Sequence, residues 1–228
     1  MVDTPSVHTY RYPRPALTAD VVLASLREES LHLLLIQRRH DPFQGQWALP
    51  GGFVNEMEPL ATGASRELQE ETGVHGVTLR QCGAFGTPGR DPRGWTVSIA
   101  FTGLLPPHGA AVHASDDAAA AQWFPVSQLP PLAFDHAYII AVGLQFLRQE
   151  ALFFLHASGW LGDRFPWKEL LRLYRILQGN DRDDALRLKK NWMDAGVLVR
   201  VHKKAKKKGK SSSPALWRLK LVTPLIAT

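Results

Sequence analysis

The sequence predicts an α/β domain followed by a smaller α+β domain. Apolar stretches with strand-like spacing surround one helix in residues 1–150, whereas residues 151–228 are mainly helical and end in two short strands. The charge changes at the same place: the first part has 10 basic and 15 acidic side chains, a net charge of −5, and the second has 17 and 6, a net charge of +11. We therefore predict two domains, residues 1–150 and residues 151–228.

The composition is that of an ordinary globular protein. With 228 residues, of which 45% are hydrophobic and 21% charged, the chain is neither of the disordered nor of the membrane type. No apolar run is long enough to span a bilayer, and the N-terminal stretch lacks the apolar core of a signal peptide. The single cysteine, Cys82, excludes an internal disulfide and suits a reducing compartment. We expect a cytoplasmic protein with no membrane partner and with Cys82 packed in a strand.

The first domain begins with a pair of predicted strands, ADVVLASL and LHLLLIQR, on either side of the turn-like REES. A loop rich in glycine and proline follows in residues 38–52. Residues 59–73 then predict a helix, with Leu60, Ala64 and Leu68 in its apolar stripe and a glycine as its C-cap. Three more strand-like stretches complete a mixed sheet, and they are VTLRQCGAFG, WTVSIAFTGLL and AAAQWFPVSQLP.

From LAFDHAYII onwards the spacing of apolar residues becomes helical. Residues 167–178 place four apolar side chains on one face, and residues 183–196 begin with acids, carry bases later and end at a glycine, as suits a helix macrodipole. VLVRVH and ALWRLKL then alternate as two strands joined by a lysine-rich loop. Helices followed by a basic hairpin predict a winged helix-turn-helix in this second domain.

An acidic cluster lies on the predicted helix of the first domain. Glu67, Glu70 and Glu71 are three and four residues apart or adjacent, so their carboxylates converge on one face. Like charges so placed repel one another, and a hard divalent cation such as Mg²⁺ or Mn²⁺ would remove that penalty. Arg66 can pair with Glu58 or Glu67 and hold the preceding loop against the helix. A solvated acidic face is the commoner explanation of a glutamate-rich helix.

The spacing of fixed residues in residues 51–74, which we call the glutamate box, decides against the solvated face. The stretch reads glycine, five residues, glutamate, seven residues, Arg-Glu-Leu, one residue, Glu-Glu, one residue, Gly-Val. Seven fixed identities at set positions arise by chance about once in a billion windows. The stretch resembles the Nudix box at every defined position, and this resemblance implies an α/β/α sandwich that cleaves a diphosphate joined to another group.

The resemblance also implies roles for individual residues. Mg²⁺ or Mn²⁺ would screen the diphosphate and activate a water molecule, with Glu67, Glu70 and Glu71 as the metal ligands. Gly51 and Gly52 lack a Cβ, so their backbone can approach the phosphates closely. The residues that the resemblance assigns to catalysis are Glu58, Arg66, Glu67, Glu70 and Glu71.

A second candidate segment, TPGRDPRGWTVSIAF, follows the glutamate box. Its guanidinium forks, Arg90 and Arg93, suit bidentate phosphate contacts, although an isolated R-D-P-R is equally a plain turn with solvated charges. Beside a Nudix box the segment resembles that of ADP-ribose pyrophosphatases and their regulatory relatives, which implies an ADP-ribose-like ligand. The candidate substrate-binding residues are Gly51, Gly52, Arg90, Asp91 and Arg93. The aromatic candidates for adenine stacking are Phe43, Trp47, Phe53 and Trp95, most of which we expect in the core instead.

One position departs from the family pattern. Many Nudix enzymes carry a glutamate three residues before a Trp-Phe pair, and here Ala120 stands at that place, ahead of Trp123 and Phe124. Asp116 and Asp117 are acidic substitutes close by in the sequence. The resemblance therefore implies metal binding more firmly than efficient catalysis.

The basic residues of the second domain predict a polyanionic partner, in the first place double-stranded DNA. A basic loop at a wing contacts phosphates, and a recognition helix enters the major groove. Solvated charge is the alternative for each group taken singly, and their coincidence with a net charge of +11 favours DNA. The candidates are Arg187, Lys189, Lys190 and Asn191 on the helix and Lys203, Lys204, Lys206, Lys207, Lys208 and Lys210 in the loop.

Four stretches extend the resemblance over nearly the whole chain. LAFDHAYII, WKELLRLYRIL, RLKKNWMDAGVLVRV and SPALWRLKL resemble the corresponding parts of NrtR-type regulators, which are bacterial repressors with a Nudix sensor and a winged helix. This resemblance implies a homodimer that binds palindromic DNA and that ADP-ribose releases from the DNA. It also implies that the protein hydrolyses ADP-ribose to AMP and ribose 5-phosphate. Two alternatives remain: a pyrophosphatase whose second domain serves dimerisation or non-specific anchoring, and a Nudix enzyme that acts on RNA ends.

Overall fold

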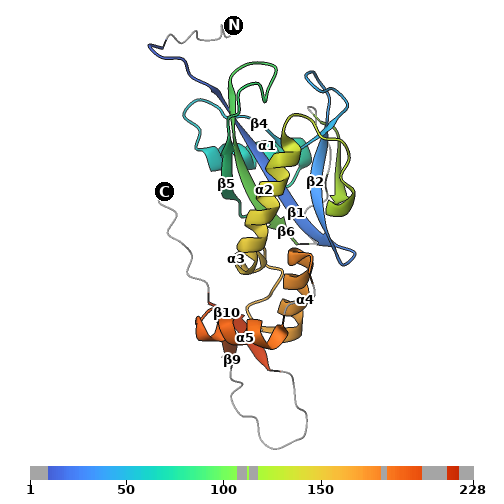
Figure 1. Ribbon diagram of the computed structural model, residues 1–228, viewed down its shortest axis with the longest axis vertical. Coiled ribbons are helices and arrows are strands. Elements are labelled where there is room, and N and C mark those ends of the chain that lie inside the picture. The colour runs from blue at the N-terminus through green and yellow to red at the C-terminus, as the bar shows by residue number, and fades with distance from the viewer. Residues whose placement is uncertain (1–9, 107–111, 113–117, 181–183, 202–214, 221–228) are drawn as a thin grey trace, which may run out of the picture.

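The computed structural model describes residues 10–106, 112, 118–180, 184–201 and 215–220. A large mixed sheet lies between two helices, and a small module with its own three-stranded sheet is attached at one end (Figure 1). The predicted fold class, an α/β/α sandwich followed by a small α+β winged helix-turn-helix, is confirmed.

The large sheet has seven strands, and all but one of their pairings are antiparallel. The strands are β1 (Ala16–Arg27), β2 (Ser30–Arg38), β3 (Trp47–Ala48), β4 (Gly51–Phe53), β5 (Arg80–Phe85), β6 (Thr96–Leu105) and β7 (Ala118–Pro125). Their order is β3-β2-β1-β6-β5, with β4 paired to β1 and β7 paired to β2. The exception is the central pair, because β1 and β6 run parallel. Cys82 lies in β5, as expected, and its thiol donates to the carbonyl oxygen of Ala100.

Two helices cover opposite faces of this sheet. On one face α1 (Leu60–Thr72) buries Ala64 and Leu68 against Val21 of β1, and Gly73 ends it in the left-handed region with φ of 73°. On the other face α2 (His136–Gln149) packs on the neighbouring residue of β1, Val22. Successive side chains of a strand point to opposite faces, so a strand covered on both sides is apolar at nearly every position.

The small module begins directly after α2. It contains α3 (Ala151–Ala157), β8 (Phe165–Pro166), α4 (Trp167–Gln178), α5 (Ala185–Asp194), β9 (Leu198–Val201) and β10 (Leu216–Leu219). The sheet order is β8-β10-β9, so α4 and α5 precede the hairpin as in a winged helix. Sequence spacing did not predict β8, because a strand of two residues has no period to detect. A short 3-10 helix, η1 (Val126–Gln128), follows β7.

One hydrophobic cluster crosses the junction between the two modules. It runs from Val22 and Leu33 of the large sheet through Leu155 of α3 and Leu173 of α4 to Trp217 of the small sheet. The predicted boundary after residue 150 coincides with a bend of 83° between α2 and α3. Because apolar packing continues across that bend, the division into two independent domains stays a prediction.

No single helix among the described residues is both long enough and apolar enough to cross a bilayer. The bent pair formed by α2 and α3 passes that test by length and composition alone. Both helices contribute apolar side chains to the hydrophobic cluster, which accounts for their composition.

Gly143 of α2 sets how closely this helix packs on the sheet. A Cβ at this position would lie 2.8 Å from Val22 Cγ2 and 3.1 Å from Thr102 Oγ1. We expect Gly143→Val to lower the free energy of unfolding by about 1–3 kcal/mol, because the added methyl groups overpack the contact. Urea unfolding measures this, with Gly162→Val as control, since no atom lies within 4 Å of a Cβ at that position. An unchanged midpoint for Gly143→Val would show that α2 moves away from the sheet at no cost.

Candidate functional site

Arg66 of α1 holds the acidic side chains of the glutamate box in one cluster. Its Nε donates to Glu58 Oε1 at 2.9 Å, and its Nη1 donates to Glu67 Oε1 at 2.7 Å and to Glu70 Oε2 at 2.9 Å. Its Nη2 donates to Glu58 Oε2 and to the carbonyl oxygen of Phe53, both at 3.0 Å. The predicted pairing of Arg66 with Glu58 and Glu67 is confirmed, and it fastens the loop before α1 to the helix.

These contacts fix the charge on two of the groups. Hydrogen bonds from Arg66, and then one from the backbone N–H of Asn55, lower the pKa of Glu58 to about 2. The bonds to Glu58 and then to Glu67 raise the pKa of Arg66 above its ordinary value. Both partners are therefore charged at neutral pH, and charge-assisted bonds of this kind are about twice as strong as neutral ones.

Two carboxylates of the box lie against the backbone of Gly51 and Gly52. The N–H of Gly51 donates to Oε2 of Glu71 at 2.8 Å, and a Cβ at Gly52 would lie 2.5 Å from Oε2 of Glu67. Burial raises the pKa of Glu71 to about 8, against the Gly51 hydrogen bond and with help from the charges of Glu67 and Asp20. Burial also raises the pKa of Glu67. Glu67 and Glu71 are thus half-buried or buried acids at one spot. A bound cation would offset the cost of ionising both.

The three proposed metal ligands do not yet surround one point. No group of three His, Cys, Asp or Glu side chains in the described part of the chain is arranged to hold an ion. Glu67 and Glu70 are bonded to Arg66, and Glu71 is bonded to Gly51. The donor set nevertheless consists of carboxylate oxygens, which suit Mg²⁺ or Mn²⁺. Metal ligation by these residues stays a prediction.

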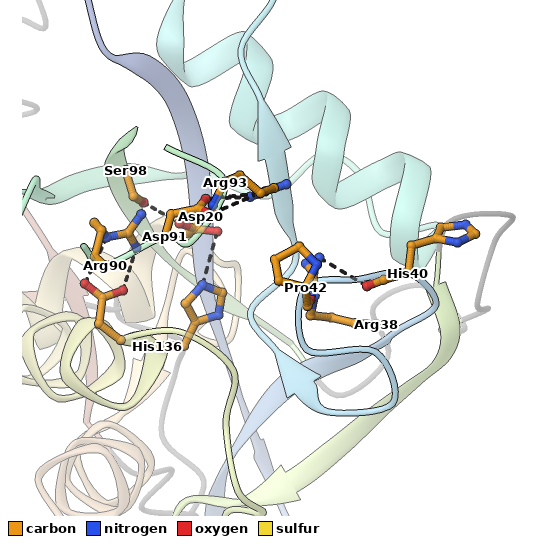
Figure 2. A network of polar contacts seen from close by, with 10 residues as sticks. Asp20, Arg38, His40, Pro42, Arg90, Asp91, Arg93, Ser98 and His136 are labelled. Carbon is orange, nitrogen blue, oxygen red and sulfur yellow. Dashed lines mark hydrogen bonds and ion pairs between the residues drawn. The ribbon is translucent and has the colours of Figure 1, made fainter. Parts of the chain in front are cut away.

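A buried polar cluster lies next to the box (Figure 2). Ser98 Oγ of β6 donates to Asp20 Oδ2 of β1, and His136 Nε2 of α2 lies 3.9 Å from the other Asp20 oxygen. His136 Nδ1 accepts from the N–H of Leu49 at 2.9 Å. Burial lowers the pKa of His136, so the ring is neutral, with its proton on Nε2 towards Asp20. The cluster thus fastens β1, β6 and α2 to the segment that leads into β4.

The two candidate phosphate-binding arginines are both paired inside the protein. Arg90 donates from Nε and Nη2 to Asp135 at 2.9 and 2.5 Å, and Arg93 donates from Nη2 to Asp91 at 2.7 Å. Burial alone would raise the pKa of Asp91, but hydrogen bonds from Arg93 outweigh it, and the pKa lies below its usual value. The guanidinium of Arg93 also lies 4.8 Å from the ring centre of Phe53. The segment is therefore built into the fold and is not a plain solvated turn.

These residues surround a cavity of about 50 Å³ beside Gly51 and Gly52. Arg38 completes a set of three arginines there, and its Nε donates to the carbonyl oxygen of Pro42 at 2.7 Å (Figure 2). Phe134 lines the cavity with φ of 52° and stacks on His136 at 5.2 Å. The residues that line it and carry the argument are Asp20, Arg38, Arg90, Asp91, Arg93 and Phe134. The cavity joins three cations and two aromatic rings to the acidic cluster of the box.

Sequence reasoning found only part of this site. It named the five candidates Gly51, Gly52, Arg90, Asp91 and Arg93, and all five line the same cavity. It missed Asp20, Arg38, Ser98, Asp135 and His136. The signal for Asp20 was present, since this acid stands alone in an apolar strand and a buried charge requires partners. The partners of Asp20 come from distant segments and carry no such signal.

The aromatic candidates divide into two pairs. Trp47 packs on Phe124 and Phe43 packs on Phe134, whereas Phe53 and Trp95 are 45% and 55% exposed. Ala120, the position that departs from the family pattern, lies in β7 opposite Gln37. Asp116 and Asp117, its acidic neighbours, lie outside the described residues.

The candidate DNA-binding residues on α5 do not all face the same way. Arg187, Lys190 and Asn191 are exposed, whereas Lys189 turns inward and places its Nζ 4.4 Å from the ring centre of Trp217. Lys189 therefore packs on the small module, and it lies three residues before Trp192, which packs on Tyr174. The loop candidates Lys203, Lys204, Lys206, Lys207, Lys208 and Lys210 lie outside the described residues.

The raised pKa of Glu71 predicts a pH-dependent stability. The folded protein keeps a proton on Glu71 that the unfolded chain releases near its ordinary pKa of 4.5, so stability falls as pH rises from about 4.5 to about 8. In the absence of divalent metal, we expect the wild type to lose up to about 4 kcal/mol of its free energy of unfolding over this pH range, relative to Glu71→Gln. Urea unfolding at several pH values measures the difference.

The matched control is Glu70→Gln, because Glu70 is on the same helix and its side chain is 58% exposed. This variant should keep the pH dependence of the wild type. Equal pH profiles for the wild type and Glu71→Gln would show that Glu71 is ionised in the folded protein throughout.

Comparison with known proteins relates this site to a family. Residues 15–142 match the family model described as the NUDIX domain. The ADP-ribose pyrophosphatase of Methanocaldococcus jannaschii is 41% identical over 129 residues, which cover 57% of this chain and 73% of that protein. The ADPR responsive transcriptional repressor NtrR of Acinetobacter baylyi is 29% identical over 193 residues, which cover 82% of this chain and 76% of the repressor.

Solved structures extend the similarity to the small module. The crystal structure of Shewanella oneidensis NrtR complexed with a 27mer DNA is 31% identical, with a TM-score of 0.69 over 90% of this chain and 93% of that one. The NUDIX domain of the same protein complexed with ADP ribose is 34% identical, with a TM-score of 0.56 over 60% of this chain and 90% of that one. Nudix hydrolases generally use divalent metal ions. With more than half of its residues in the family model and a match to NrtR over nearly its full length, this chain belongs to the Nudix family, in its NrtR-type branch.

Proposed function

We propose that this protein is a transcriptional regulator that binds double-stranded DNA through its small module and senses an ADP-ribose-like nucleotide through its Nudix module. The observation that carries the proposal is the presence, in one chain, of an arginine-lined cavity beside an intact glutamate box and of a basic helix exposed at the other end. The similarity to NrtR over nearly the full length supports the combination.

The nucleotide would bind at the cavity beside Gly51 and Gly52. Asp135 and Asp91 hold Arg90 and Arg93 in fixed orientations, so the remaining N–H groups of each fork are preorganised for phosphate oxygens. The exposed ring of Phe53 or that of Trp95 is available to stack on the adenine.

Hydrolysis is the second part of the proposal. A bound Mg²⁺ or Mn²⁺ would screen the diphosphate and lower the pKa of an attacking water. Glu67, Glu70 and Glu71 would hold the ion, while Glu58 anchors Arg66 and keeps the loop before α1 in place. Water adds to one phosphorus of ADP-ribose, the bridging P–O bond breaks, and AMP and ribose 5-phosphate leave. Ala120 supplies no carboxylate, and we therefore propose slow turnover.

DNA would bind to the outer face of α5. None of the residues of this helix is fully buried, and Asp184 caps its N-terminus by accepting from the N–H groups of Leu186 and Arg187. Trp192 faces inward and packs on Trp167 and Tyr174. The opposite face carries the exposed basic residues. A homodimer would place two such helices in successive major grooves about 34 Å apart, on a palindromic site.

The alternative function is a pyrophosphatase whose small module serves dimerisation or anchoring. The intact box and the 41% identity to an archaeal ADP-ribose pyrophosphatase favour it. It differs from the first proposal because it predicts fast hydrolysis of ADP-ribose and no DNA binding that changes when ADP-ribose is added.

The decisive experiment measures duplex binding by fluorescence anisotropy, with the DNA upstream of the gene, at about 0.1 M salt. We expect ADP-ribose to weaken binding by the full-length wild type. Arg93→Gln should bind the duplex normally but lose the response. Arg187→Ala should lose about 1–3 kcal/mol of DNA affinity and keep ADP-ribose binding.

Turnover of ADP-ribose with Mg²⁺ is measured on the same proteins. We expect slow release of AMP that Glu71→Gln abolishes. Absence of duplex binding together with fast turnover would establish the alternative function, and stronger binding of single-stranded RNA than of duplex would point to RNA ends as the substrate.

Two apolar residues on α5 predict part of the DNA sequence preference. Leu186 and Met193 are 78% and 45% exposed and lie seven residues, or about 10 Å, apart on one face. Apolar side chains in a major groove contact the C5 methyl group of thymine. We expect duplexes selected from a random library to carry a thymine that Leu186→Ala no longer prefers. Replacing that thymine by uracil should weaken wild-type binding and leave Leu186→Ala unaffected, whereas equal losses in both would exclude the contact.

A further inference from the structure

Three consecutive residues, Phe134, Asp135 and His136, connect the cavity beside the glutamate box to the start of α2. We call them the 134–136 segment, and they lie within the stretch LAFDHAYII of the sequence. Phe134 has φ of 52°, in the left-handed region that a residue with a bulky side chain rarely adopts. Strained backbone of this kind persists where the surrounding structure holds it, and it is common at functional sites.

Each of the three arginines of the cavity contacts this segment. The guanidinium groups of Arg38 and Arg93 lie 4.9 and 5.6 Å from the ring centre of Phe134. Arg90 donates two hydrogen bonds to Asp135. Burial, and next the charge of Arg93, lower the pKa of Arg38, so these two cations lie close enough to repel each other. The face of an aromatic ring attracts cations, and the ring of Phe134 therefore offsets part of that repulsion.

The segment also holds the backbone that leads to the glycine pair. His136 Nδ1 accepts from the N–H of Leu49 at 2.9 Å. The carbonyl oxygen of Pro50 accepts from β1 at 2.8 Å, and the N–H of Gly51 donates to α1 at 2.8 Å. Three consecutive residues are thus bonded to three different elements. Leu49 is 1% exposed, so without the imidazole its N–H would be buried with no acceptor, and the backbone would shift to find one.

The orientation of the His136 ring is itself fixed. The residue is 4% exposed, its ring stacks on that of Phe134 at 5.2 Å, and its Nε2 points towards Asp20 at 3.9 Å (Figure 2). The same carboxylate lies against the glycine pair, because a Cβ at Gly51 would be 2.7 Å from Asp20 Oδ1. With its proton on Nε2, the ring presents Nδ1 as an acceptor to the backbone.

We propose that the 134–136 segment is the positioning element of the nucleotide site, which aligns the glycine backbone and the arginines for one diphosphate. His136 holds the glycine backbone through Leu49, and Phe134 and Asp135 hold the arginines. Donors that are fixed before the ligand arrives need no reorganisation when it binds. This role rests on the proposed binding of a nucleotide at the cavity, and it adds residues that act on the phosphates through other groups.

The test of His136 compares two substitutions in the full-length protein, with ADP-ribose binding measured by isothermal calorimetry without divalent metal. His136→Asn puts an amide oxygen close to the place of Nδ1 and keeps an acceptor for Leu49, whereas His136→Leu removes the acceptor. We expect His136→Leu to bind ADP-ribose about tenfold more weakly, the effect of one buried donor left unpaired. His136→Asn should restore most of the affinity, which a purely structural role of the ring would not explain.

The test of Phe134 uses Phe134→Leu, which keeps an apolar side chain and removes the aromatic face. We expect it to bind ADP-ribose several-fold more weakly. The matched control is Phe146→Leu, because Phe146 lies further along α2 and its ring is 5.4 Å from the guanidinium of Arg80. This control loses a comparable contact between a cation and a ring outside the cavity, and it should bind ADP-ribose as the wild type does.

Gly143→Val separates positioning from stability. It disturbs the packing of α2 on the sheet without touching the 134–136 segment, so it should unfold at lower urea concentration and still bind ADP-ribose normally. Equal affinity in the wild type, His136→Leu and Phe134→Leu would overturn the positioning role alone. Equal losses in His136→Asn and His136→Leu would overturn the contact through Leu49. A wild type that binds no ADP-ribose would overturn the proposed function as well.

Discussion

The approach of two carboxylates to the Gly51–Gly52 backbone is the contact on which the Nudix module depends. A Cβ at Gly51 would lie 2.2 Å from the carbonyl oxygen of Ala19, and one at Gly52 would lie within the carboxylate of Glu67 at 2.5 Å. A side chain at Gly51 would therefore collide with the backbone of β1, and one at Gly52 would displace the Glu67 carboxylate. The strand pairing of β4, the burial of Glu71 and the neighbouring arginine cavity all follow from that gap.

In the same region, acidic and basic side chains are paired with one another. Arg66 neutralises part of the acidic cluster, and Asp135 and Asp91 fix two of the three arginines across the cavity. The carboxylate of Glu67 and the arginine-lined cavity thus adjoin the same glycine pair. A ligand that carries a cation on one side and phosphates on the other would satisfy both sets at once, which is the chemistry of a metal-bound diphosphate.

The sequence predicts those features that short-range spacing encodes. The helix of the glutamate box, its cap at Gly73 and the apolar face of α4 all follow from local periods. Asp20, Ser98 and His136 meet from three elements far apart along the chain, and Asp135 is 45 residues from Arg90, so no local pattern reveals either contact. Lys189 has a contact of the same kind: residue type indicated DNA, and its Nζ lies over the ring of Trp217 in a later strand.

The hydrophobic cluster that crosses the α2–α3 bend limits how a signal can travel. The two modules share one apolar body along α3 and α4, because Leu155 and Leu173 are packed into the same cluster as Val22. Separating the modules would cost the burial of that shared surface. The small module is therefore packed firmly on the sheet. A nucleotide bound at the far end of the Nudix module can reorient it only by shifting the helices that connect the two modules.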